Sequence, residues 1–164
     1  MRLALLLFLS ALYFSCDAQP QPDRKLGVLI EAGPLLVSGE PDYVPNARRL
    51  RVIVLKHFNG FSLGTGFGLD GYYANNTAPL FLDFRYYEID KFVPFLNVGN
   101  AMRLGPEFDS GLIINAGAMT NIIPNKKWLK ASLGYNYQRV SDRFLDKKVG
   151  KSAVSIGLIF SLFN

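Results

Sequence analysis

Five charged residues stand out because each lies inside an otherwise apolar or alternating segment. They are Glu31, Arg51, Asp83, Arg85 and Lys130. A charged side chain that leaves water alone is costly, so such groups are expected to pair with each other or to act as acids, bases or ligands. Both signs are present, which predicts an interior ion-pair network. Its role is open at this point, between structural filling of an interior and a selectivity or ligand site.

Other residues with catalytic or metal-binding chemistry are scarce. His57 is the only histidine, and we expect it to be a solvated residue in a turn. Cys16 is the only cysteine and lies near the N-terminus. A metal site or a histidine-dependent triad needs several such groups together. The sequence therefore predicts no catalytic, cofactor or metal site and no enzyme.

Two glycine motifs superficially resemble nucleotide-binding loops. The run Gly64-Thr65-Gly66-Phe67-Gly68 has glycines at every second position, which is a strand period, and no βαβ unit follows it. Gly150-Lys151-Ser152 has the end of a phosphate-binding loop, but Leu145 occupies the position where that loop requires its first glycine. Neither motif predicts a nucleotide site.

The N-terminus predicts export. Met1-Arg2 is a short basic start, residues 3–14 are almost all apolar, and Cys16-Asp17-Ala18 precedes Gln19. This pattern is typical of a cleaved secretory signal peptide, and the apolar run is shorter than the roughly 20 residues of a membrane-spanning helix. We therefore predict a signal peptide at 1–18 and one domain at 19–164. Acylation of Cys16, as in a lipoprotein, is the alternative to its removal with the signal.

The net charge of +5 does not indicate nucleic acid. The cations occur mostly in pairs near segment ends, such as Arg24-Lys25 and Arg48-Arg49, and no helix gathers them on one face. Solvated ends explain them better than a nucleic-acid partner does.

The rest of the chain consists of eight apolar or alternating segments separated by turn residues. None has a sustained helical period, so the class is all-β. The links between the segments alternate in expected length: 57–60, 88–91 and 122–127 are short, whereas 38–48, 74–78, 103–110 and 141–150 are mostly longer. Outer-membrane barrels have short turns at one rim and longer loops at the other. The segments are approximately 26–37, 49–56, 61–73, 79–87, 92–102, 111–121, 128–140 and 151–163.

The composition of the two strand faces decides which face looks outward. In 61–73, Phe61, Leu63, Phe67 and Leu69 alternate with small or polar residues. A soluble barrel would carry many long charged side chains on its polar face, but here that face is mainly Gly, Ser and Asn. Small residues suit the inside of a narrow cylinder and leave room for bulkier ones, and we expect Arg51 and Arg85 to use that room. A cation at mid-membrane on the lipid face costs about 2–4 kcal/mol, which also places the five charged residues inside.

Aromatic residues near segment ends predict interfacial girdles, although core or loop packing explains any one of them equally well. The set is Tyr72, Tyr73, Tyr86, Tyr87, Phe92, Trp128, Phe144 and Phe163.

Three segments resemble strands of small outer-membrane β-barrel proteins of Gram-negative bacteria, the porin-like and OmpA-like group. Residues 79–87 (PLFLDFRYY) resemble a common strand, 134–138 (GYNYQ) the penultimate strand, and 156–163 the closing strand. The resemblance implies an eight-stranded barrel without catalytic residues. Such barrels often end on an aromatic residue that the assembly machinery recognises, whereas this chain ends Phe163-Asn164.

The sequence thus predicts an all-β, antiparallel, up-and-down eight-stranded transmembrane β-barrel in the cell outer membrane. We expect a structural, adhesive or narrow-pore role, a monomer, and partners limited to outer-membrane lipid and the barrel assembly machinery. The alternative is a soluble periplasmic or secreted lipocalin-like barrel that binds an apolar ligand. A barrel enzyme acting on lipids has no visible catalytic set.

Overall fold

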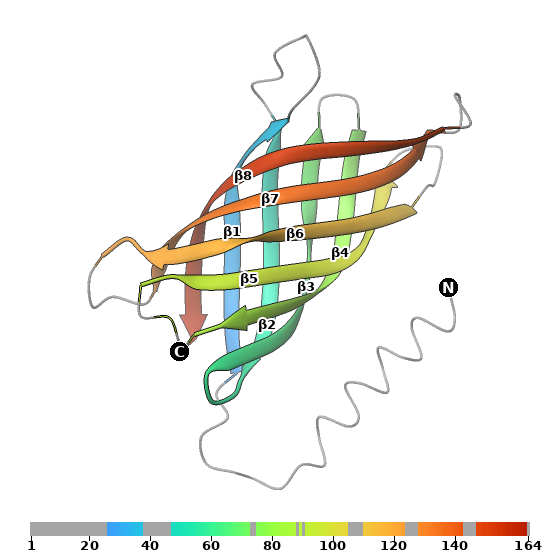
Figure 1. The fold of residues 1–164 in the computed structure, drawn as a ribbon. Coiled ribbons are helices and arrows are strands. Elements are labelled where there is room, and N and C mark those ends of the chain that lie inside the picture. Colours follow the sequence, from blue (N-terminus) through green and yellow to red (C-terminus); the bar gives the residue numbers. More distant parts are fainter. Residues whose placement is uncertain are drawn as a thin grey trace, which may run out of the picture.

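Eight strands make up the computed structural model (Figure 1). It describes residues 26–37, 47–72, 75–87, 89, 91–104, 110–123, 128–142 and 147–163. The predicted signal peptide and Cys16 lie outside these residues, as do Tyr73 and Phe144. The strands are β1 (Leu26–Val37), β2 (Arg48–His57), β3 (Phe61–Tyr72), β4 (Asn75–Tyr86), β5 (Val93–Leu104), β6 (Ser110–Asn121), β7 (Leu129–Asp142) and β8 (Lys147–Phe163).

Each strand pairs antiparallel with its neighbours in the chain, and β8 pairs with β1 to close a barrel. Closure leaves the sheet without an edge strand, so the backbone polar groups of the barrel wall find partners within the sheet. The predicted fold class, an all-β up-and-down barrel of eight antiparallel strands, is confirmed. The described part of the chain contains no helix that is both long and apolar enough to cross a membrane.

The two rims of the barrel differ in what they carry. β1, β3, β5 and β7 begin at one rim, where β2, β4, β6 and β8 end, and we call it the start rim. The opposite ends of the eight strands lie at the other rim, which we call the hairpin rim. The predicted contrast between short and long links is wrong, since 73–74 is shorter than 58–60.

Strand extension explains that error. β4 already begins at Asn75, which pairs with Tyr72, and β7 and β8 pair as far as Asp142 and Lys147. These polar residues have turn-like composition, but their backbones continue the ladder beyond the apolar part of the strands. The last described pair of β7 with β6 is at Gln138 and that of β8 with β1 is at Ala153, and beyond them the segments 139–142 and 147–150 pair only with each other. They form a hairpin that projects beyond the barrel.

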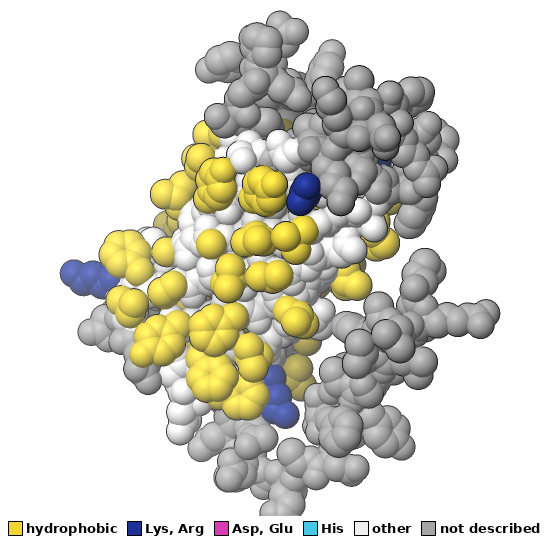
Figure 2. Space-filling view, turned by 45° about the vertical axis from the view of Figure 1, so that its right-hand side comes forward, with side chains coloured by type: hydrophobic (Ala, Val, Ile, Leu, Met, Phe, Trp, Pro, Cys, Tyr) yellow, Lys and Arg dark blue, Asp and Glu magenta, His cyan; other side chains and the backbone are white. Residues whose placement is uncertain are grey.

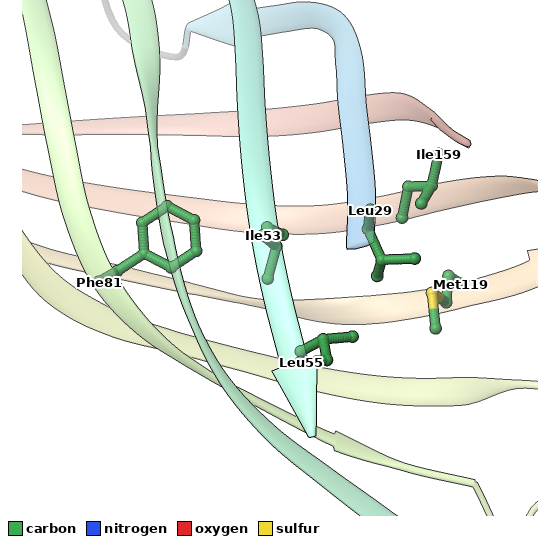
Figure 3. Packing of buried hydrophobic residues seen from close by; sticks show 6 residues of the cluster. All are labelled: Leu29, Ile53, Leu55, Phe81, Met119 and Ile159. Carbon is green, nitrogen blue, oxygen red and sulfur yellow. The ribbon is translucent and has the colours of Figure 1, made fainter. Parts of the chain in front are cut away.

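The strand period of two separates an outer and an inner face along every strand. Leu82 (70% exposed), Phe67 (60%) and Leu133 (59%) are typical of the outer face. Figure 2 shows hydrophobic side chains spread over one side of the barrel, with cationic side chains at its margins. On the inner face, a cluster of apolar side chains from five strands fills part of the lumen (Figure 3). Its members are Leu29, Ile53, Leu55, Phe81, Met119 and Ile159.

Candidate functional site

The lumen wall holds the charged residues that the sequence singles out. All five are on the inner face and nearly inaccessible to solvent, with 7% exposure at Lys130 and 2% or less at the others. The described contacts of four of these residues fall into two clusters that stand on different strands. Whether their role is structural stays a prediction.

The first cluster, here the Asp83 cluster, consists of Asp83, Arg85, Asn97 and Asn115. Arg85 donates two hydrogen bonds to the Asp83 carboxylate, from Nε to Oδ1 (2.8 Å) and from Nη2 to Oδ2 (3.0 Å). Asn97 also donates to Asp83, and Asn115 donates to the amide oxygen of Asn97 (2.8 Å). Paired, hydrogen-bonded charges of this kind tolerate burial because their polar atoms keep partners.

The second cluster, here the Asp70 cluster, consists of Glu31, Arg49, Arg51 and Asp70. Arg51 donates to Asp70 from Nη2 (2.6 Å) and Nε (3.3 Å), and Arg49 Nε lies 3.4 Å from Asp70 Oδ1. Arg49 Nη1 also lies 3.9 Å from Glu31, which accepts a hydrogen bond from Ser132. This cluster ties β1, β2, β3 and β7 together across the lumen.

Two members of the Asp70 cluster were not among the five predicted charges. Asp70 lies on the glycine-rich face of its strand, and that position is the signal that could have found it. Arg49 was expected to be a solvated segment end, but it is only 4% exposed because β2 begins one residue earlier and places Arg49 opposite Asp70. Its neighbour Arg48 is exposed, as predicted for a segment end.

An amide row follows the hydrogen-bonded ladder across four strands. Asp83, Asn97, Asn115 and Asn136 are successive partners on β4, β5, β6 and β7. All four are buried. The alternation of the sequence places each of these asparagines on the polar face, but only the register shows that they are neighbours.

Glycines on the inner face provide the space that the large lumen side chains occupy. A Cβ atom at Gly68 would lie 2.7 Å from Cγ of Arg51, and one at Gly117 would lie 2.8 Å from the Phe95 ring. The absence of a side chain at Gly68 therefore provides the space that was predicted for Arg51. Both arginines also face an aromatic ring, Arg51 at 4.9 Å from the centre of Phe81 and Arg85 at 5.6 Å from that of Phe95.

We expect Gly66→Ala to lower the free energy of unfolding by about 1–3 kcal/mol, the usual cost of overpacking. The added Cβ would lie 2.5–2.6 Å from two atoms of the Phe81 ring, so the ring has to move. Gly71→Ala on the same strand is the control, because its Cβ meets only Asn76 Oδ1 at 3.3 Å and a carbonyl at 3.7 Å. Urea titration in detergent, followed by the fluorescence of the only tryptophan, measures both. Equal loss in the two variants would contradict close packing at Gly66.

The start rim places His57 and Tyr87 differently from expectation. His57 is not in a turn but is the last residue of β2, half-buried, with its ring 5.6 Å from that of Tyr87. Tyr87 was expected in an aromatic girdle, but it packs on the lumen cluster. Burial raises the pKa of the Tyr87 hydroxyl above its ordinary value, so this phenol is uncharged at neutral pH.

Other aromatic residues do gather on the outside of the start rim. Phe61 stacks on Phe58 (4.9 Å between ring centres) and on Phe84 (6.1 Å), and Trp128 stacks on Phe160 (6.5 Å). Phe92 and Trp128 are exposed. Aromatic rings at this level of a barrel are typical of a membrane interface.

The chemistry available in the lumen is electrostatic. The Asp70 and Asp83 carboxylates are each bound by an arginine, and no described group of three or more His, Cys, Asp or Glu side chains is placed to hold a metal ion. The arrangement can fix strands to one another and fill the interior.

Comparison with solved structures supports the fold. Neisserial surface protein A is 15% identical, with 82% of this chain and 96% of that chain covered and a TM-score of 0.50. Ail, the attachment invasion locus protein of Yersinia pestis, is 15% identical, with 82% and 97% covered and a TM-score of 0.52. A de novo designed transmembrane β-barrel is 14% identical, with 88% and 100% covered and a TM-score of 0.50. No protein-family model and no curated protein sequence matches the chain.

Proposed function

We propose that the chain is an integral barrel of the outer membrane of a Gram-negative bacterium, with a structural or adhesive role and a closed lumen. The observation that carries this proposal is the inversion of the usual protein pattern: the exposed face of the barrel is apolar and the charges are inside. A soluble protein rarely exposes a continuous apolar surface of this extent, because water would drive it to associate. Lipid is the medium that such a surface suits.

The height of the apolar surface supports the same proposal. On the outer face of β2, Arg48 and Lys56 bracket Leu50, Val52 and Val54. Eight residues at about 3.3 Å each, on a strand tilted by roughly 45°, rise about 19 Å. Long cationic side chains extend toward the head groups at both ends. The apolar band therefore comes close to the 25 Å or so of outer-membrane barrels.

The soluble lipocalin-like alternative loses support from the lumen. An apolar ligand needs a cavity lined mainly by apolar side chains. Here the lumen holds the guanidinium groups of Arg51 and Arg85, both fully buried, with their carboxylate partners. The buried arginines and carboxylates also fill the space that a pore would need, so they favour a structural or adhesive role over a narrow pore.

The names of two similar structures support an adhesive role. One is a surface protein and the other an attachment invasion locus protein. We propose that contacts with other molecules, if the role is adhesive, are made at the hairpin rim, where the β7–β8 hairpin projects beyond the wall. The proposed partners in the membrane are lipid and the barrel assembly machinery, the proposed oligomeric state is a monomer, and catalysis has no part in the proposal.

Membrane fractionation tests the proposal. We expect the protein to stay in the membrane fraction through high-salt and alkaline washes, and to migrate faster on a gel when unheated than when boiled, because the closed barrel stays compact in detergent. A soluble periplasmic barrel of the same fold is the control. Recovery of the protein in the soluble fraction would overturn the membrane assignment and favour the lipocalin-like alternative.

A further inference from the structure

Among the described residues of the start rim, Tyr87 places its side chain against the lumen. Tyr87 directly follows β4 and continues the inward positions of Asp83 and Arg85. It packs against the apolar cluster that fills this part of the lumen, so it lies between the cluster and the outside. The next residue inward in that series, Arg85, is 1% exposed.

The contacts of Tyr87 come from different parts of the wall. Its backbone N–H donates to the carbonyl of Gly60 (2.7 Å) in the β2–β3 link, a turn that Gly60 completes with a φ of 78°. Its ring lies 5.6 Å from the ring of His57 on β2, with an angle of 64° between the two planes. The ammonium of Lys130 on β7 lies 5.7 Å from the centre of the same ring. In the barrel, β8 and β1 separate β7 from β2 on one side, so a ring that reaches both spans the mouth.

Ser62 shows the effect of this position. It is the second residue of β3, close to the rim, and it has an ordinary polar side chain, yet it is fully inaccessible to solvent. A polar residue at the mouth of an open barrel would be wet. Its position on β3 does not by itself explain why Ser62 is buried, so another group at the mouth of the lumen has to cover this side chain.

We propose that Tyr87 is a lid that closes the lumen to water at the start rim. The ring is held by His57 of β2 and Lys130 of β7, the backbone of Tyr87 is bonded to Gly60 in the β2–β3 link, and the ring packs on an apolar cluster that water does not favour. The lid goes beyond the proposed function, because it concerns access to the lumen from one end and holds whichever medium surrounds the barrel. Its removal opens a path to Ser62 and then toward the Asp83 cluster.

Thiol accessibility at position 62 tests the lid. Cys16 is the only native cysteine, so a Cys16→Ser background leaves Ser62→Cys as the one reactive group. The folded, purified protein in detergent is treated with a charged, water-soluble methanethiosulfonate reagent. We expect slow modification with Tyr87 present, at least tenfold faster modification in Tyr87→Ala, and slow modification in Tyr87→Phe, which keeps the ring.

Tyr86→Ala is the matched control, because Tyr86 is the adjacent tyrosine and faces outward. It is expected to leave the rate unchanged. Gel migration of unheated samples shows that each variant is folded, and Tyr87→Val replaces Tyr87→Ala if the latter does not fold. Equal rates in all variants, or acceleration by Tyr86→Ala as large as that by Tyr87→Ala, would overturn the lid. Neither result depends on where the protein resides, so failure of the lid is distinct from failure of the membrane assignment.

Discussion

Replacing Asp83 with leucine is expected to lower the free energy of unfolding by about 3–5 kcal/mol, the cost of leaving one partner of a buried ion pair alone. Asp83 accepts two hydrogen bonds from Arg85 and one from Asn97, and all three residues are buried. Without the carboxylate, the Arg85 guanidinium stays inside the lumen with no counter-charge from its own strand. Urea unfolding in detergent, followed by Trp128 fluorescence, measures the loss.

The double variant Asp83→Leu with Arg85→Met separates the charge effect from a packing effect. It removes both charges and retains apolar volume, and such replacements of buried pairs are often neutral or stabilising. We therefore expect the double variant to recover most of the stability that Asp83→Leu loses. A double variant as unstable as the single one would show that shape, and not charge pairing, makes Asp83 important.

Replacing the preceding residue, Leu82, with arginine is expected to cost about 2–4 kcal/mol in a bilayer, as for a cation at mid-membrane on a lipid-facing strand. Leu82 is 70% exposed, and its partners Thr65 and Val98 lie near the middle of β3 and β5. In a soluble barrel, an arginine at so exposed a position would be almost neutral. The folded fraction in lipid vesicles and the yield of membrane-inserted protein measure the effect.

Leu104→Arg is the control for this experiment. Leu104 is also exposed (47%) but is the last residue of β5, at the hairpin rim, where a cation costs only about 0–1 kcal/mol. We expect Leu104→Arg to insert almost as well as the unmodified protein. Equal tolerance of arginine at both positions would mean that the outer face does not contact hydrocarbon.

The alternation of the sequence was sufficient to predict the fold and the two faces, because side chains in a strand follow a strict period of two. Glu31, Arg51, Asp83, Arg85 and Lys130 could be placed inside from parity alone. Their partners could not, because which side chains meet across the lumen depends on strand register and on the tilt of the barrel. Asp70 and Arg49 are partners of this kind, 21 residues apart in number but opposite each other in the wall.

The ends of the strands were the least predictable part. Local composition suggests a turn at Asn75–Thr77 and around 141–150, but a ladder continues wherever a neighbouring backbone offers hydrogen bonds. The prediction that Tyr87 belongs to an aromatic girdle was wrong for a related reason. Tyr86 and Tyr87 together look like an interfacial pair in the sequence, and only the closed barrel shows that Tyr87 faces the lumen while Tyr86 faces outward. The residue types near a strand end do not reveal which parts of the barrel lie beside them in space.

The amide row and the close packing of Phe81 beside Gly66 both affect how the barrel avoids pairing its strands in a wrong register. A slip of one residue between two strands would turn an entire face over and place asparagines and charges on the outer face of the barrel. A slip of two residues keeps the faces but separates Asn97 from Asn115 and moves Phe81 away from the space beside Gly66. Under the proposed membrane location, odd errors are therefore opposed by the lipid and even errors by the packing of the interior. The contacts of the inner face therefore select one register between neighbouring strands as the barrel forms.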